Sequence, residues 1–315
     1  MVLVLLLLPL RMFGWGCRGH ETVALLAWQQ MGPHARQRAA ELLARSPIDP
    51  ALARYCPNPG LGDFVDSSTW ADDIREHRPE TGPWHFINIP LGMASGDLNP
   101  FCPTERACVV QAIRRQLEVL RSPQAGTAEQ AEALRFLIHL VGDLHQPLHA
   151  TTNNDQGGNC VPVTFFGAMP QPVGSTPEEL ARDNYRPNLH GVWDTELVER
   201  SLGAEALPAF ARRLRHRFAR DSAAWKRQPA DLEAWAWESH DAAVRVAYGK
   251  LPHAVTAEAP RPITRCSDDD QVGRRMLGLQ ESIGPAYFQQ AKPVIDRQLA
   301  RAGTRLAALL NQLWP

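Results

Sequence analysis

Apolar residues recur along most of this chain at the three- and four-residue spacing that is typical of amphipathic helices. The clearest run covers residues 281–313, where the apolar positions are Ala286, Phe288, Ala291, Val294, Leu299, Ala302, Leu306, Leu309 and Leu310. The same spacing predicts further helices over residues 20–45 (broken near Gly32 and Pro33), 68–77, 106–121, 127–146, 176–202, 205–219 and 230–249.

The segments between these runs are rich in proline and glycine and predict loops, at residues 47–63, 78–83, 89–105, 151–175 and 251–268. Only residues 161–166 have the character of a strand, as half of a small hairpin. No linker separates two self-sufficient halves. The sequence therefore predicts a single, mainly α domain with at most a small β-hairpin.

The chain has 315 residues, a formal net charge of -1, 44% hydrophobic residues and 21% charged residues. This length is enough for a substantial core. A net charge so close to zero argues against a protein that binds nucleic acid through a broad basic field. Bound metal ions could still supply positive charge locally.

The N-terminus carries an apolar run at residues 2–10, which is too short to span a bilayer at about 20 residues. The run is typical of the core of a secretory signal, and the alternative is a buried first helix. The six cysteines (17, 56, 102, 108, 160 and 266) include no CxxC pair, which favours disulfides and an oxidising compartment. Cys102 and Cys108 bracket a short loop and are predicted to pair, whereas the other four allow three pairings.

Two histidine–aspartate pairs are candidates for metal binding. His139 and Asp143 lie one turn apart on a predicted helix that is apolar nearly all round, and His190 and Asp194 have the same spacing. His149 lies between the pairs. A buried carboxylate is costly unless it is paired or bound to metal. One such pair more often forms a hydrogen bond, but two pairs and a third histidine make zinc about equally plausible.

Seven segments, in order along the chain, resemble motifs of the trinuclear-zinc nucleases of the S1/P1 type. They are residues 15–20 (WGCRGH), 69–75 (TWADDIR), 84–90 (WHFINIP), 139–149 (HLVGDLHQPLH), 157–159 (GGN), 188–194 (NLHGVWD) and 299–311 (LARAGTRLAALLN). Each match is weak alone, whereas their joint order and spacing are specific. In this family residue 15 corresponds to the mature start, so residues 1–14 are expected to be a signal peptide and residues 15–315 the nuclease domain.

The resemblance implies nine protein ligands for three zinc ions. One zinc would take Asp72, His85, His139 and Asp143, and a second would take His149, His190 and Asp194. The third would take His20, Asp143 and the α-amino nitrogen and carbonyl oxygen of Trp15. The other histidines (34, 77, 145, 216, 240 and 253) have no matching role and are interpreted as surface or structural residues, and Cys17 as a structural cysteine.

The resemblance also implies a zinc-dependent phosphodiesterase that cleaves single-stranded DNA or RNA to 5′-phosphate products and acts as a 3′-nucleotidase. Asp72 and Arg75 would be catalytic, with a surface ion pair to Asp72 or Asp73 as the alternative for Arg75. The predicted base-binding residues are Phe86, Asn88, Gly157 and Asn159, although Phe86 could instead belong to the core. A base can stack on a side chain only when it is unpaired, which explains the single-strand preference.

We therefore expect a secreted or periplasmic enzyme with no stable membrane association and no obligate protein partner. The nearest alternative is a zinc-dependent phospholipase C, which shares the three-zinc plan. In those lipases the last carboxylate ligand along the chain is Glu, whereas this chain has Asp194. They also lack the segment that contains Arg75. A zinc-sequestering protein is a second alternative, but storage would not need Arg75 or the base-site residues.

Overall fold

The computed structural model describes residues 15–57, 59–102, 108–228 and 230–315, so the predicted signal peptide lies outside the described residues. The α-helices are α1 (Cys17–Trp28), α2 (Pro33–Arg45), α3 (Asp63–Asp66), α4 (Trp70–Asp73), α5 (Val109–Arg121), α6 (Thr127–Leu144), α7 (Pro177–Leu180), α8 (Leu189–Gly191), α9 (Leu197–Leu202), α10 (Leu207–Arg217), α11 (Ala219–Arg227), α12 (Leu232–Ala242), α13 (Asp268–Leu277) and α14 (Pro285–Leu313). Short 3-10 segments are η1 (Ser67–Thr69), η2 (Ile74–Glu76), η3 (Pro79–His85), η4 (Asn99–Phe101) and η5 (Pro147–Ala150), and π-helical segments are η6 (Val192–Glu196) and η7 (Ala243–Tyr248).

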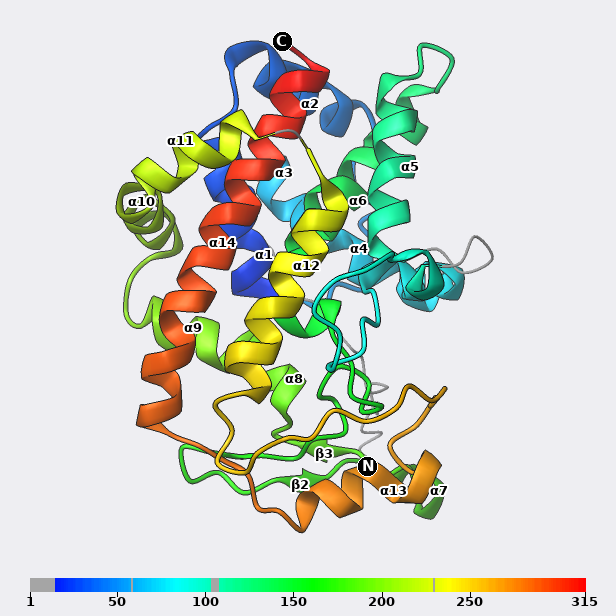
Figure 1. Cartoon of the computed structure of the whole chain (residues 1–315). Coiled ribbons are helices and arrows are strands. Elements are labelled where there is room, and N and C mark those ends of the chain that lie inside the picture. Colours follow the sequence, from blue (N-terminus) through cyan, green and yellow to red (C-terminus); the bar gives the residue numbers. More distant parts are fainter. Residues whose placement is uncertain (1–14, 58, 103–107, 229) are drawn as a thin grey trace, which may run out of the picture.

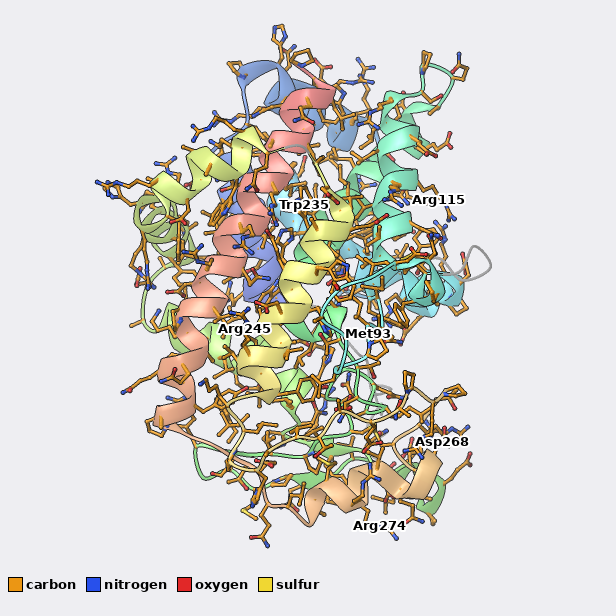
Figure 2. All side chains as sticks on the ribbon, in the orientation of Figure 1. Met93, Arg115, Trp235, Arg245, Asp268 and Arg274 are labelled. Carbon is orange, nitrogen blue, oxygen red and sulfur yellow. A yellow bond between two sulfur atoms is a disulfide. The ribbon has the colours of Figure 1, made fainter. Side chains whose placement is uncertain are left out.

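The helices form a bundle in which α14 runs along much of the molecule with α12 at its side and α1 behind it (Figure 1). Helix α6 lies inside the bundle, and all of its residues from 133 to 144 are buried. Side chains fill the space between the helices (Figure 2). Trp235 of α12, for example, is buried, and the Arg305 guanidinium of α14 lies 4.7 Å from its ring centre. The loops and short strands gather at one end of the bundle (Figure 1).

Two small sheets account for the strands in the described part of the chain. Strand β1 (Thr164–Phe165) pairs in parallel with β4 (Ser282–Ile283), and β2 (Gln171–Pro172) pairs antiparallel with β3 (Tyr185–Arg186). The mainly α prediction is therefore confirmed. The small hairpin predicted at residues 161–166 is present as a tight turn, in which Phe165 and Ala168 form an antiparallel bridge with backbone hydrogen bonds of 2.9 Å in both directions. The sheet partner of β1 is β4, which lies more than 100 residues further along the chain and was not predicted.

Several predicted helices are confirmed, including the two helices broken near Pro33, α6 and the long C-terminal helix. The prediction of one helix over residues 176–202 is wrong. Strand β3 interrupts it, Pro187 cannot donate a backbone hydrogen bond, and the Asn188 side chain starts a new helix by accepting from the Gly191 N–H at 2.8 Å. Helix α13 was not predicted. None of the helices in the described residues is long and apolar enough to cross a membrane.

All six cysteines form disulfides. The predicted Cys102–Cys108 bond is present. The remaining pairs are Cys17–Cys56, with Cα atoms 5.6 Å apart, and Cys160–Cys266, with Cα atoms 5.1 Å apart. Cys17 is therefore a structural cysteine, as predicted, and the disulfide content is typical of proteins from oxidising compartments. The third bond ties the segment after the GGN turn to the predicted 251–268 loop.

Candidate metal centre

The centre is built on the buried face of α6. His139 and Asp143 are both fully buried there, one turn apart. The neighbouring residue Gly142 leaves room for His20 of α1, since a Cβ atom at Gly142 would lie 2.9 Å from His20 Nδ1. The His20 ring stacks on the His139 ring with 3.8 Å between ring centres. Helices α1 and α6 therefore bring three predicted ligands together.

Backbone carbonyl groups orient three of the imidazoles. His139 Nδ1 donates to the Ser68 carbonyl at 2.7 Å, His149 Nδ1 to the His85 carbonyl at 2.6 Å, and His190 Nδ1 to the Gly157 carbonyl at 2.7 Å. These partners assign the proton of each neutral ring to Nδ1. Each Nε2 atom is then left with a lone pair that can bind a metal ion.

The residues fit a cation by a direct test of their geometry. His149 Nε2 and His190 Nε2 face each other at 3.2 Å, although both Nδ1 atoms already donate to carbonyl groups. Two lone pairs at this distance repel each other, and a positive ion beside them removes the repulsion. Both ring nitrogens of His20 and the Oδ1 atom of Asp143 are buried without a hydrogen-bond partner. Unsatisfied buried groups of this kind are costly, and metal binding satisfies them.

The carboxylates lie between the imidazoles. Asp143 is 2.9 Å from His85 Nδ1, 3.1 Å from His139 Nε2 and 3.5 Å from His20 Nε2. Asp72 of α4 is 3.6 Å from His85 and 3.7 Å from His139. Three groups have ligand atoms within 4.8 Å of one another: His20, Asp72 and His139; His85, His139 and Asp143; and His149, His190 and Asp194. Imidazole and carboxylate groups are typical zinc ligands.

The electrostatics of the cluster favour bound positive charge. Burial lowers the pKa of His20, and it lowers that of His85 to about 4, so both rings are neutral at pH 7 and can act as ligands. Burial opposes charge on His139, but the carboxylates of Asp143 and Asp72 outweigh it and raise its pKa to about 9. Burial also raises the pKa of Asp194 well above its usual range. A cation compensates such buried carboxylates.

The other predicted ligands lie beside this core of the cluster. The Asp194 side chain accepts a 2.5 Å hydrogen bond from the Gln146 amide and lies 3.3 Å from His190 Nε2. Trp15 is fully buried, and its ring contacts the position that a Cβ at Gly142 would occupy, at 3.8 Å. The N–H of Gly16 donates to the Asp194 carbonyl at 2.7 Å. The chain therefore enters its first helix at the metal cluster.

A pocket of about 300 Å³ opens onto the cluster at His85, His149 and His190. It is also lined by Arg75, Gly82, Pro83, Phe86, Asn88, Leu148, Gln156, Gly157 and Ile263. Four of the predicted substrate-contacting or catalytic residues, namely Arg75, Phe86, Asn88 and Gly157, therefore share this pocket. Phe86 is half-buried in the pocket wall rather than part of the core.

Asn159 and Arg75 have contacts that the sequence left open. Asn159 does not line this pocket; its amide donates to the Gln156 carbonyl at 2.9 Å, and it faces a second cavity that includes Arg186 and His190. The Arg75 guanidinium lies 3.4 Å from Asp72, so the alternative ion pair is present in the pocket wall, and Asp73 accepts from the Tyr55 N–H instead.

Sequence reasoning missed several residues of the site. Gln146 donates a hydrogen bond to the Asp194 carboxylate. It lies within the 139–149 motif, but the sequence alone indicated no role for it. Gln156 directly precedes the GGN motif and lines the pocket, but a single glutamine in a loop does not indicate a binding site. Ile263 comes from a proline-rich loop more than 100 residues further along the chain. No local pattern could have predicted its place in the pocket.

The remaining histidines lie outside the cluster. His145 is buried, donates from Nδ1 to the Val141 carbonyl at 2.7 Å and accepts from Arg305 at 3.0 Å. His240 is buried and contacts Thr151 at 2.9 Å. The other four, His34, His77, His216 and His253, are exposed. The interpretation of all six as surface or structural residues agrees with these positions.

Comparison with known proteins identifies the relatives of this chain. A family model described as S1/P1 Nuclease matches residues 15–315. The chain is 27% identical to Nuclease S1 of Aspergillus oryzae over 95% of this chain and 91% of that protein, and 27% identical to Nuclease P1 of Penicillium citrinum over 95% and 97%. It is 26% identical to Endonuclease 2 of Arabidopsis thaliana over 96% and 91%.

These relatives are nucleases, so the phospholipase C alternative is not favoured. The three His/Asp groups agree with the three-zinc centre that the resemblance implied. The chain belongs to the S1/P1 nuclease family, whose members are zinc-dependent nucleases that prefer single strands and have 3′-nucleotidase activity.

Proposed function

We propose that nine residues of this chain hold three zinc ions and that the resulting centre hydrolyses phosphodiester bonds in single-stranded DNA or RNA, leaving 5′-phosphates. Asp72, His85, His139 and Asp143 would hold one ion; His149, His190 and Asp194 the second; and His20, Asp143 and the Trp15 amine and carbonyl the third. The facing Nε2 atoms of His149 and His190, 3.2 Å apart at the floor of the pocket, carry this proposal.

When bound, zinc lowers the pKa of the attacking water and polarises the phosphoryl group as a Lewis acid. The side chains of this chain do the remaining work. Arg75 lies beside Asp72 at the pocket edge and can donate a fork of N–H groups to a phosphoryl oxygen as negative charge develops. Asp72 contributes by holding the Arg75 guanidinium and by its place among the imidazoles.

The pocket also offers a site for a base beside the scissile phosphate. Phe86 presents a half-buried ring for stacking, and the Asn88 amide can hydrogen-bond to base edges. The positive φ of Gly157, at 62°, brings its backbone close to His190 and the pocket. A duplexed base cannot enter such a pocket, which accounts for a preference for single strands. A 3′-nucleotide fills the pocket with its phosphate at the histidines, which accounts for 3′-nucleotidase activity.

We also propose that the working enzyme begins at Trp15 and is secreted or periplasmic. A peptide nitrogen is a poor metal ligand because its lone pair is delocalised, whereas a free α-amine binds zinc readily. Removal of residues 1–14 would create that amine next to the cluster. The three disulfides support export to an oxidising compartment.

The test is an activity comparison on purified protein that begins at Trp15. We expect release of acid-soluble nucleotides from single-stranded DNA, much slower release from duplex DNA, and phosphate release from 3′-AMP. Phosphocholine release from lecithin without nucleotide release would instead support a lipase, and zinc binding without either activity would support a storage protein. Either of those results would contradict the proposed function.

A further inference from the structure

A groove of about 490 Å³ continues from the active-site pocket. The two cavities share Asn88, Gln156 and Ile263. The groove touches none of the pocket's three histidines and does not reach Arg75. It therefore leaves the pocket at the end opposite the metal ligands. One wall carries Pro90, Pro100, Phe101 and Thr152, and the other is formed by residues 258 to 264.

The far wall is held in place by two buried asparagines. Asn153 donates from its amide to the Thr256 carbonyl at 3.0 Å and accepts from the Glu258 N–H at 2.9 Å. Asn154 accepts from the Arg261 N–H at 2.9 Å and donates to the Ala259 carbonyl at 2.8 Å. The two side chains thus make four hydrogen bonds to the backbone of residues 256–261. These bonds fix the position of the groove wall.

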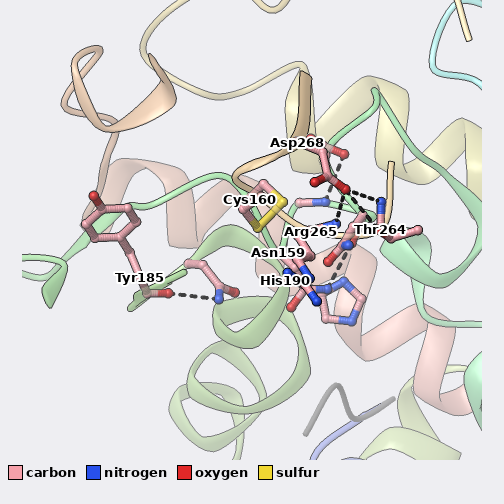
Figure 3. The surroundings of a disulfide bond; sticks show 12 residues. Asn159, Cys160, Tyr185, His190, Thr264, Arg265 and Asp268 are labelled. Carbon is pink, nitrogen blue, oxygen red and sulfur yellow. Dashed lines mark hydrogen bonds between the residues drawn. A yellow bond between two sulfur atoms is a disulfide. The ribbon is translucent and has the colours of Figure 1, made fainter. Parts of the chain in front are cut away.

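The far end of the same wall is fixed separately, at the Cys160–Cys266 disulfide (Figure 3). Asp268 accepts hydrogen bonds from the Thr264 N–H at 2.9 Å, the Thr264 hydroxyl at 2.9 Å and the Arg265 N–H at 2.8 Å. The segment that contains Ile263 is thus anchored on both sides. A site that is built before its ligand arrives loses less entropy on binding.

The groove has the chemistry of a single-strand subsite. Phe101 is half-buried and presents an aromatic ring to the groove, where a base can stack. Arg261 and Glu258 both line the groove and pair at 2.9 Å, and Glu258 pairs also with Arg275 behind the wall at 3.0 Å. The carboxylate is thus shared between two guanidinium groups, so it compensates the positive charge of Arg261 only in part. This local charge suits a backbone phosphate although the net charge of the whole chain is -1.

We propose that this groove binds the nucleotide on the 5′ side of the one held in the active-site pocket, with its base against Phe101 and the phosphate that links the two nucleotides near Arg261. The inference rests on the proposed function, in which the pocket nucleotide points its 3′-phosphate at the histidines. Its 5′ oxygen then points away from the metal ligands. The groove leaves the pocket on that side, so the strand enters the groove in the 5′ direction.

The test compares the initial rate of phosphate release from 3′-AMP with that from the 3′-phosphorylated dinucleotide ApAp. The dinucleotide products are separated, so that release of phosphate with formation of ApA is counted apart from cleavage of the internal phosphodiester. The wild type should have about tenfold higher kcat/KM on the dinucleotide, as expected for one stacked base. Phe101→Leu keeps the apolar contact and removes the ring, and Arg261→Gln removes the charge. Each should lower kcat/KM for the dinucleotide about fivefold or more and leave 3′-AMP hydrolysis within about twofold.

Arg245→Gln is the matched control. Arg245 is exposed (Figure 2) and pairs with Asp241 at 2.6 Å. It lines neither cavity, so its loss should change the hydrolysis of neither substrate. Equal losses on both substrates in the groove variants, or no loss on the dinucleotide, would overturn the subsite. A wild type that releases phosphate from neither substrate would overturn the proposed function and the subsite together.

Discussion

The Arg75→Ala variant tests the catalytic part of the proposal most sharply. The guanidinium lies 3.4 Å from Asp72, which is too long for a strong hydrogen bond, so the loss of this contact should cost little stability and the variant should fold. A charge about 4 Å from the developing negative charge contributes up to about 4 kcal/mol at an effective dielectric constant of 20. This agrees with the loss of about 10²–10³-fold in kcat that follows removal of one transition-state donor.

The assay is steady-state hydrolysis of 3′-AMP by enzyme with verified zinc content. We expect kcat to fall by about 10²–10³-fold for Arg75→Ala, with a smaller change in KM, because the donor acts on charge that develops during the reaction. Arg75→Lys should recover part of the rate, since it keeps the charge but loses the fork.

Arg78→Ala is the control, because Arg78 lies on the same segment and pairs with Glu80 at 3.1 Å but does not line the pocket. It should retain nearly all of the wild-type rate. If Arg75→Ala raises KM and leaves kcat unchanged, Arg75 binds substrate in the ground state and the catalytic role assigned to it is wrong.

Three further predictions concern the metal ligands, a disulfide and the N-terminus. Asp143→Ala should abolish activity and lower Tm, because it removes a buried carboxylate that lies beside three imidazoles; a normal melt with normal turnover would refute its placement. Replacing both Cys160 and Cys266 by Ser opens a bridge between residues 106 positions apart and should lower the free energy of unfolding by about 4.7 kcal/mol; urea melts measure it, and an unchanged midpoint would contradict the estimate. Protein that still carries residues before Trp15 should bind less zinc and lose most of its rate, and equal activity of both forms would show that the terminal amine is not a ligand.

The sequence predicted the helical class and the face of α6 that carries His139 and Asp143, because a 3.6-residue repeat is a local signal. The four-residue spacing of His190 and Asp194 also predicted that their side chains lie on the same face of a helix. What joined these pairs into one site was the resemblance to a family, since spacing alone left zinc and hydrogen bonding about equally plausible. The helix over 176–202 failed because strand β3 pairs with β2, a contact that helical periodicity does not report.

The parts of the site that escaped prediction are set by tertiary contacts. The carbonyl groups that orient the imidazoles belong to Ser68, His85 and Gly157, and backbone atoms leave no mark in a sequence. Ile263 reaches the pocket because the disulfide and Asp268 hold its loop on one side and Asn153 and Asn154 hold it on the other. The pairing of Cys17, Cys56, Cys160 and Cys266 also depends on the tertiary structure, since all three possible pairings were consistent with the sequence.

The central claim is that this cluster is a three-zinc centre, and metal analysis tests it most directly. Purified protein that begins at Trp15 should be dialysed against metal-free buffer and its zinc measured by elemental analysis beside its protein concentration. We expect about three zinc ions per chain, one for each group of ligands. One zinc or fewer per chain, in a folded and fully processed sample, would contradict it.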